Sequence, residues 1–213
     1  MRKIVKCIEP DALTVWKRQH PKGCYDDLEK TKQHGIRQAI RQTCLIEQYY
    51  LCAYCCKPIG IKQSDCMNEH VEARDIAPQR SLDFSNIVAS CRTPNQCDAA
   101  HGSQPLPLTP FMAECETELK FKISGRVEGL TERAKAAIKV LNLGESEQSN
   151  RSLVEKRRQL VSSLLMVNDV DPAAGLEDDD LIHLVIADIQ QPKDGKLEAY
   201  APVVVNILSQ WLS

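Results

Sequence analysis

The chain has 213 residues, of which 43% are hydrophobic and 26% are charged, and its formal net charge is −2. This length can enclose one hydrophobic core, or a small module with helical additions. A net charge so close to zero excludes a protein that coats nucleic acid by bulk electrostatics. The charge is +4 over residues 1–48, −1 over 49–110 and −5 over 111–213. A contact with nucleic acid is therefore expected in the first two segments, or on a partner.

No targeting segment is predicted at the N-terminus. Met1–Lys6 is followed by Cys7, Glu9 and Asp11, without the apolar run that a signal peptide requires. No stretch is long and apolar enough for a membrane span, so we expect a cytoplasmic protein that does not enter membranes. In that compartment, the 10 cysteines of the chain indicate metal ligation more than a disulfide framework.

The N-terminal segment, residues 1–48, is predicted to be a helical arm. A helix is expected from Pro10 to about His20, where Pro21-Lys22-Gly23 ends it. A second helix is expected from Asp26-Asp27 to about Gln48, because apolar residues recur there at helical spacing. Its basic residues form either a solvated face or a set of phosphate contacts: Lys30, Lys32, Arg37 and Arg41.

A C-x-x-C motif follows this helix. Residues 49–54 are expected to form a short strand that leads into a turn carrying Cys52 and Cys55. Cys91 and Cys97 form a second pair, with a spacing loose enough to require a loop between them. Two such pairs can supply the four thiolates of a tetrahedral structural zinc. A redox pair or buried free thiols are the alternatives.

Polar residues that are candidates for catalysis or metal binding lie between and beside the two cysteine pairs. Glu69 and His70 should lie on a strand over residues 68–71, and adjacent strand residues point to opposite sides. Asn86 begins the next apolar run. Asp98 and His101 are expected in the first turn of a helix, where a spacing of three residues places them on one face.

Taken in order, these elements resemble the HNH endonuclease motif of the ββα-metal, or His-Me finger, fold. The resemblance is closer to the HNH proteins of Septu-type and retron-associated antiphage defence systems. It includes the lead-in Gln48-Tyr49-Tyr50-Leu51 and the later Pro107-Leu108-Thr109-Pro110, and it covers roughly residues 1–145. It implies an α+β protein with a small zinc-stapled core and helical flanks.

The resemblance also implies roles for individual residues. His70 matches the histidine that acts as general base, and Asn86 matches the asparagine that fixes the loop carrying that base. Glu69 and Asp98 match ligands of a catalytic Mg²⁺ or Mn²⁺. His101 stands where the family often has lysine, so it is either a third ligand or a phosphate contact. Arg74 and Arg80 are further candidate phosphate contacts.

The domain organisation expected from this resemblance has three parts: the arm (1–48), the nuclease core with its zinc (49–110) and a mostly helical region (111–213) that docks a partner. The implied function is DNA cleavage by an effector subunit, in a hetero-oligomeric antiphage complex with an ATPase of the ABC or AAA type. Two alternatives stay open, a non-catalytic zinc-binding adaptor and an RNA-cleaving enzyme of the same fold.

The C-terminal region has weaker signals. Short strands are expected at residues 111–112 and 119–123. Helices are expected over 131–143 and 150–165, from Asp178 onward, and over 197–211, with a break at residues 172–175.

Overall fold

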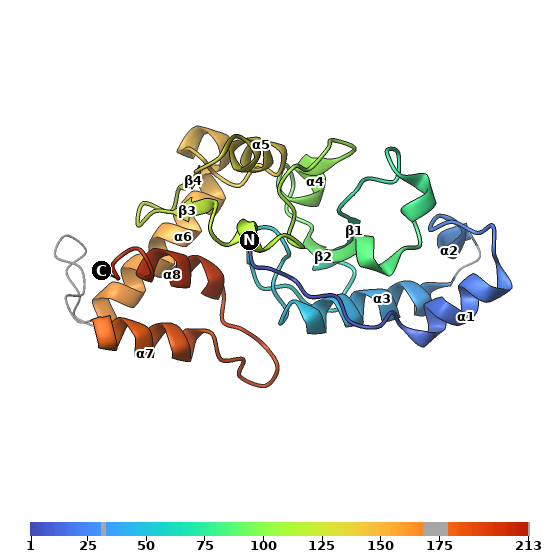
Figure 1. The fold of residues 1–213 in the computed structure, drawn as a ribbon, viewed down its shortest axis with the longest axis horizontal. Coiled ribbons are helices and arrows are strands. Elements are labelled where there is room, and N and C mark those ends of the chain that lie inside the picture. Colours follow the sequence, from blue (N-terminus) through green and yellow to red (C-terminus); the bar gives the residue numbers. More distant parts are fainter. Residues whose placement is uncertain (31–32, 168–178, 213) are drawn as a thin grey trace.

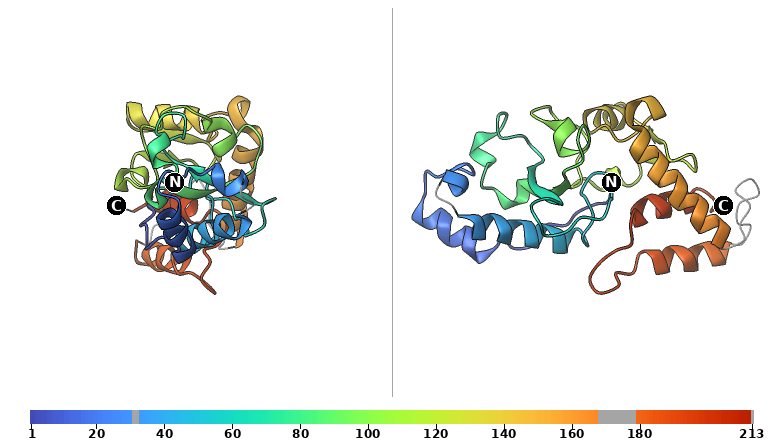
Figure 2. Two further views of the ribbon diagram at one scale, coloured as in Figure 1. Left: turned by 90° about the vertical axis from the view of Figure 1, so that its right-hand side faces the viewer. Right: turned by 180° about the vertical axis from the view of Figure 1, so that it is seen from behind.

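A computed structural model describes residues 1–30, 33–167 and 179–212. The molecule is elongated, with helices α1 to α3 at one end and α6 to α8 at the other (Figures 1 and 2). Two small antiparallel sheets lie between these ends. Helices and strands alternate with long turns along the chain, which agrees with the α+β class expected from the sequence.

The N-terminal helices are α1 (Asp11–Gln19), α2 (Asp27–Lys30) and α3 (His34–Glu47). The prediction of α1 is confirmed. The prediction of one continuous second helix is wrong, because α2 ends at Lys30 and Gln33 has a non-helical backbone before α3 begins. Residues 31–32 lie outside the described part of the chain.

The first ten residues follow the core as an extended arm. The Ile4 amide donates to the Pro110 carbonyl at 2.7 Å. The Lys6 ammonium pairs with Glu47 at 2.6 Å, donates to the Ile87 carbonyl at 2.8 Å and lies 3.6 Å from the centre of the Phe84 ring. This cation ties the arm both to the end of α3 and to the central hairpin.

The central hairpin consists of β1 (Cys66–His70) and β2 (Ile87–Cys91), and the one-turn helix α4 (Asp98–His101) follows it. The two strands are antiparallel, with Cys66 opposite Cys91 and His70 opposite Ile87. The 3₁₀ turns η1 (Pro78–Arg80) and η2 (Phe84–Asn86) connect them. The predictions of a strand around Glu69-His70 and of a helical turn from Asp98 are confirmed.

The expected strand over residues 49–54 is wrong. Tyr49 and Tyr50 have positive φ angles of 50° and 61°, which reverse the chain after α3. Only Leu51 forms a bridge, to Pro58, and the Ile59 amide donates to the Tyr50 carbonyl at 2.9 Å. Residues 51–58 therefore form a tight turn, called the knuckle turn below.

A second hairpin, β3 (Leu119–Phe121) and β4 (Val127–Gly129), follows the 3₁₀ turn η3 (Ala113–Cys115). The prediction of β3 is confirmed, and the strand expected at residues 111–112 is wrong. Gly125, in the turn between β3 and β4, has a φ of 83°, and a Cβ there would lie 2.0 Å from the Val154 carbonyl oxygen. The turn therefore requires glycine.

Four further helices complete the described chain: α5 (Glu132–Val140), α6 (Glu147–Val167), α7 (Asp179–Ile189) and α8 (Ala201–Leu208). Thr131 caps α5 by accepting a hydrogen bond from the Ala134 amide. The last helix begins later than predicted, because Tyr200 has a left-handed backbone with a φ of 57°. The predicted break at residues 172–175 lies outside the described residues.

One hydrophobic cluster contains residues from the N-terminal helices, the central hairpin and the C-terminal helices, for example Leu13, Ile87 and Ile207. The three-part domain organisation stays a prediction. Within the described ranges, no helix has the length and apolarity needed to cross a bilayer.

Candidate active site

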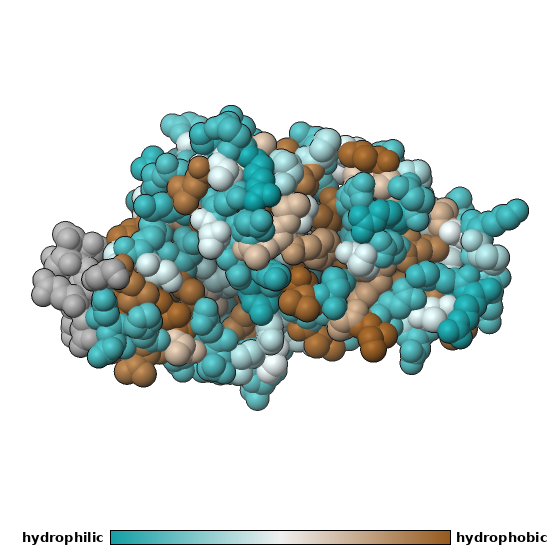
Figure 3. Space-filling model, in the orientation of Figure 1, coloured by the Kyte–Doolittle hydropathy of each residue, from teal (hydrophilic) through white to brown (hydrophobic). Residues whose placement is uncertain are grey.

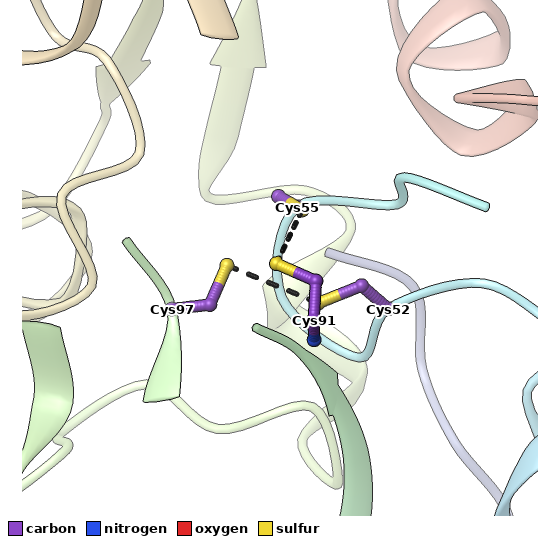
Figure 4. A group of neighbouring side chains, drawn as sticks. All are labelled: Cys52, Cys55, Cys91 and Cys97. Atoms are coloured by element: carbon purple, nitrogen blue, oxygen red, sulfur yellow. Dashed lines mark hydrogen bonds between the residues drawn. The ribbon is translucent and has the colours of Figure 1, made fainter. Parts of the chain in front are cut away.

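Four cysteine side chains converge beside the central hairpin. Cys52 and Cys55 lie on the knuckle turn, Cys91 ends β2 and Cys97 precedes α4 (Figure 4). All four are at most 1% exposed. Their sulfur atoms lie within 4.8 Å of one another, with 3.8 Å between Cys52 and Cys97 and 3.9 Å between Cys55 and Cys91. We call this group the thiol cluster.

The thiol cluster has the geometry of a zinc site. Zinc–sulfur bonds of about 2.3 Å place tetrahedral ligands about 3.8 Å apart, and a disulfide would need sulfurs about 2.05 Å apart. Hydrogen bonds from Cys52 and Cys55 lower the pKa of Cys91, whereas burial raises the pKa of Cys97. Four sulfur donors suit zinc and could hold it as a structural ion.

A buried cation accompanies the cluster. The Arg157 guanidinium is fully buried and donates to the Leu143 carbonyl at 2.7 Å. Burial lowers its pKa, and the nearby Cys55 and Cys56 oppose that shift. Four thiolates around one Zn²⁺ carry a net charge of −2, so a neighbouring guanidinium helps to offset the charge of a loaded site.

Next to the thiol cluster, two acids and a histidine meet between β1 and α4. The Glu69 carboxylate lies 2.6 Å from His101 Nδ1 and accepts from the Tyr54 hydroxyl at 3.3 Å. Burial, followed by the hydrogen bond with Glu69 and then the Glu69 charge, raises the pKa of Asp98 to about 8. Burial also raises the pKa of Glu69. Two carboxylates held this close favour a bound cation or a shared proton.

The donor atoms of this second group are of the type that Mg²⁺ and Mn²⁺ prefer. Among the described residues, the four cysteines are the set whose ligand atoms all lie close enough together to hold a metal ion. The donor atoms of Glu69, Asp98 and His101 are therefore less tightly gathered than the sulfur atoms. The carboxylates of Glu69 and Asp98 are the residues that would hold the ion.

His101 is fully buried, so it is poorly placed to touch a phosphate. A carboxylate only accepts hydrogen bonds, so Nδ1 carries the proton in the contact with Glu69. Nε2 is then a buried acceptor without a partner in the described chain. The geometry favours His101 as the residue that orients Glu69, as outer histidines do around ligating carboxylates.

His70 faces away from Glu69, toward the N-terminal helices. Its ring meets the edge of Tyr25 at 4.8 Å, and its Nε2 lies 2.8 Å from the Ser81 carbonyl oxygen. Since a carbonyl only accepts, Nε2 carries the proton and Nδ1 keeps its lone pair. Burial lowers the pKa of His70 to about 4, so the ring is neutral at pH 7.

Asn86 fixes the loop that follows His70. Its side chain accepts from the Glu72 amide at 2.8 Å and donates to the Glu72 carbonyl at 2.9 Å. Its own carbonyl accepts from the Val71 amide at 2.9 Å. These three bonds lock the backbone just beyond the histidine, and they use both ends of the asparagine side chain.

The two candidate phosphate contacts near this site are engaged elsewhere. Arg74 pairs with Asp26, and Arg80 pairs with Glu72 and Asp83. The sequence did not single out Tyr54, Tyr25 or the Ser81 carbonyl. A backbone carbonyl has no sequence signature, and Tyr25 lies 45 positions before the histidine that it contacts.

Two antiparallel strands followed by a short helix, next to four clustered thiols, are consistent with the ββα-metal arrangement expected from the sequence. Among curated proteins, the chain is similar to the "Retron Ec83 putative HNH endonuclease" of Escherichia coli, with 29% identity over 96 residues. The match covers 43% of this chain and only 37% of that relative. No model of a known protein family matches the chain. The similarity supports the HNH endonuclease resemblance at the level of the family.

Proposed function

We propose that this chain is a metal-dependent endonuclease that hydrolyses phosphodiester bonds in DNA. The observation that carries the proposal is the end of β1. There an imidazole held through Nε2 by the Ser81 carbonyl, and kept neutral by its lowered pKa of about 4, lies next in sequence to a carboxylate that is hydrogen-bonded to Asp98. The similarity to a relative named as an HNH endonuclease supports the same reaction class.

Each residue has a stated task in this reaction. His70 Nδ1 accepts the proton of the attacking water, which requires the neutral ring. Ser81 and Tyr25 hold the ring in one orientation, and Asn86 holds the loop behind it. Glu69 and Asp98 would hold Mg²⁺ or Mn²⁺, with Glu69 oriented by His101. When bound, the ion clamps the scissile phosphate and stabilises the departing oxygen.

We further propose that the chain works as the effector subunit of an antiphage complex with an ATPase, as the Septu-type and retron-associated resemblance implies. The C-terminal region offers an apolar surface for such a partner. Leu184 on α7 is 69% exposed, and Met166 at the end of α6 is 77% exposed. Hydrophobic residues gather over the α7 end of the molecule (Figure 3).

The catalytic proposal is tested with His70→Ala and a matched control, His183→Ala, which removes an exposed histidine far along the chain. Nicking of supercoiled plasmid is measured with Mg²⁺ or Mn²⁺, alongside zinc content and melting temperature. We expect the His70 variant to lose roughly 10²-fold or more of the rate, with zinc content unchanged, and the control to cut normally.

Two outcomes favour the alternatives. If zinc binds but wild type and His70→Ala are equally inert, the chain is a zinc-binding adaptor. If the wild type cuts transfer RNA and leaves plasmid intact, the substrate is RNA. The complex is tested by co-purification of wild type and a Leu184→Asp variant with the product of the neighbouring open reading frame. A point variant is preferable to removing the C-terminal helices, because Val203 and Ile207 of α8 belong to the main core.

A further inference from the structure

A basic groove runs past the start of β1, outside the candidate active site. Two adjoining hollows of about 900 Å³ and about 330 Å³ share Ile61 and Lys62 in their walls. The hollows are lined by six cationic side chains from α3, the knuckle turn and its following loop, the loop after β2 and the segment before α8: Arg37, Arg41, Lys57, Lys62, Arg92 and Lys196. Asp65 is the acidic residue in the lining.

Arg41 lies at the floor of this groove. It is only 7% exposed, and its Nε has no hydrogen-bond partner among the described residues. Its Nη1 makes one long hydrogen bond, 3.4 Å to the Ile61 carbonyl. A buried guanidinium is costly unless an anion or several acceptors satisfy it. The solvated-face interpretation is therefore wrong for Arg41, and its surroundings indicate an anion that binds from outside the chain.

Other cations approach the same loop from different elements. Arg92, just after β2, is exposed and donates to the Gln63 carbonyl at 3.1 Å. Arg41 and Arg92 thus contact the loop over residues 61–63 from two sides. Lys196 lies 5.0 Å from the centre of the Tyr50 ring, which holds it at the far end of the groove. Side chains distant in sequence are gathered here around one open space.

The groove is connected to the candidate active site by β1 itself. The strand begins at Cys66, beside Arg41, and ends at His70. Halfway along, the Asn68 side chain donates to the Arg37 carbonyl at 2.9 Å, so α3 accompanies the strand. Four residue steps of about 3.3 Å span about 13 Å, which corresponds to about four base-pair steps of 3.4 Å along the axis of a DNA helix.

We propose that this basic groove binds the phosphodiester backbone of a nucleic acid, a few nucleotides from the bond that is cleaved by the water that His70 activates. The inference rests on the proposed nuclease function for its position relative to cleavage. The cations are spread along a track that leads to the candidate base, as a repeated row of phosphates requires. An acidic protein segment would also neutralise these cations, but its binding would not require the groove to continue toward His70.

The test compares two triple variants of the full-length chain. Lys62→Ala/Arg92→Ala/Lys196→Ala removes three exposed cations of the groove. Lys120→Ala/Arg151→Ala/Lys156→Ala removes the same charge from exposed positions on β3 and α6. Binding of fluorescein-labelled 20-base-pair DNA, of RNA of the same sequence and of polyglutamate is measured by anisotropy across a range of salt concentrations. No divalent metal is added, so binding is read without cleavage and the zinc is retained.

We expect the groove variant to bind about tenfold or more weakly, with the slope of log affinity against log salt reduced by about 2 to 3. The control variant should stay within about twofold of wild type. The Arg41→Gln variant, if it folds, should also bind nucleic acid more weakly than wild type. If that variant does not fold, the triple variant of exposed cations decides the groove proposal. The DNA and RNA arms report which backbone the groove prefers.

Three results would overturn the proposal: equal affinity and slope for both triple variants, a wild type that binds neither duplex, or a groove variant that loses only the binding of polyglutamate. The outcome is separable from the nuclease proposal. If the chain binds nucleic acid through the groove but never cuts it, the groove proposal stands and the nuclease proposal fails. If cutting depends on His70 but not on the groove, the nuclease proposal stands and the groove proposal fails.

Discussion

Loss of one cluster sulfur should unfold the hairpin, which is a far larger effect than a buried cysteine normally has. Cys55→Ala leaves three thiols that cannot complete a tetrahedral site. A structural zinc contributes roughly 10–16 kcal/mol of apparent binding free energy at pH 7, and a domain of ordinary stability unfolds with about 5–15 kcal/mol. Because the cluster joins the knuckle turn, β2 and the entry to α4, most of that stability depends on the metal.

Cys115→Ala is the matched control. Cys115 is also fully buried but lies outside the thiol cluster. Its loss should cost on the order of 1–2 kcal/mol as a small cavity, which corresponds to a melting temperature lowered by about 2–8 °C. Zinc content by elemental analysis and thermal unfolding by circular dichroism measure both variants. A chelator added to the wild-type chain should reproduce the Cys55→Ala result.

The reasoning is refuted if Cys55→Ala retains one zinc per chain and melts at the wild-type temperature. It is also refuted if a metal-free wild-type chain melts at the same temperature as the zinc-loaded one. In either case the four sulfurs would be ordinary core side chains that lie close together by packing alone.

Three further predictions concern buried charges. Lys6→Ala leaves Glu47, whose side chain is 3% exposed, without its cation, and should lower the free energy of unfolding by about 3–5 kcal/mol in urea titration; a loss below 1 kcal/mol would contradict this. The pKa of Asp98 is about 8, so binding of Mn²⁺ at pH 7 should release close to one proton, measured by calorimetry in buffers of different ionisation enthalpy, and Asp98→Asn should abolish that release. The pKa of His70 falls from 6.5 to about 4 on folding, so the unfolded chain takes up this proton first and stability is lost as pH falls from 6.5 toward 4, by about 3 kcal/mol in total; His70→Gln should remove that part of the acid sensitivity.

The sequence was most informative where chemistry dictates spacing. Two cysteine pairs and the Glu69-His70 strand predicted the thiol cluster and the order of strand, strand and helix, because metal ligands and strand alternation leave little freedom. Glu69 and His70 point to opposite sides, as their adjacency on a strand predicts. Local signals of this kind need no knowledge of what packs against them.

The sequence was least informative where contacts are distant. The ring of His70 is held by Tyr25 from before α2 and by a backbone carbonyl at Ser81. Strand β4 has three residues, too few for alternation to be visible. The sequence places Arg41 among the basic residues of a helix, but in the structure it is buried and contacts the carbonyl of Ile61 in a distant loop. In each case the decisive partner comes from another part of the chain.

The register of the central hairpin links the thiol cluster to the candidate active site. Cys91 is held by the cluster at one end of β2, and Asn86 is held by Glu72 just before the other end. A slip of one residue between the strands would exchange the faces of Glu69 and His70, turning the carboxylate toward Tyr25 and the imidazole toward α4. Neither group could then perform its proposed task. A zinc ion bound by the thiol cluster would therefore act on the proposed catalysis without touching substrate, since it would fix the register on which both side chains depend.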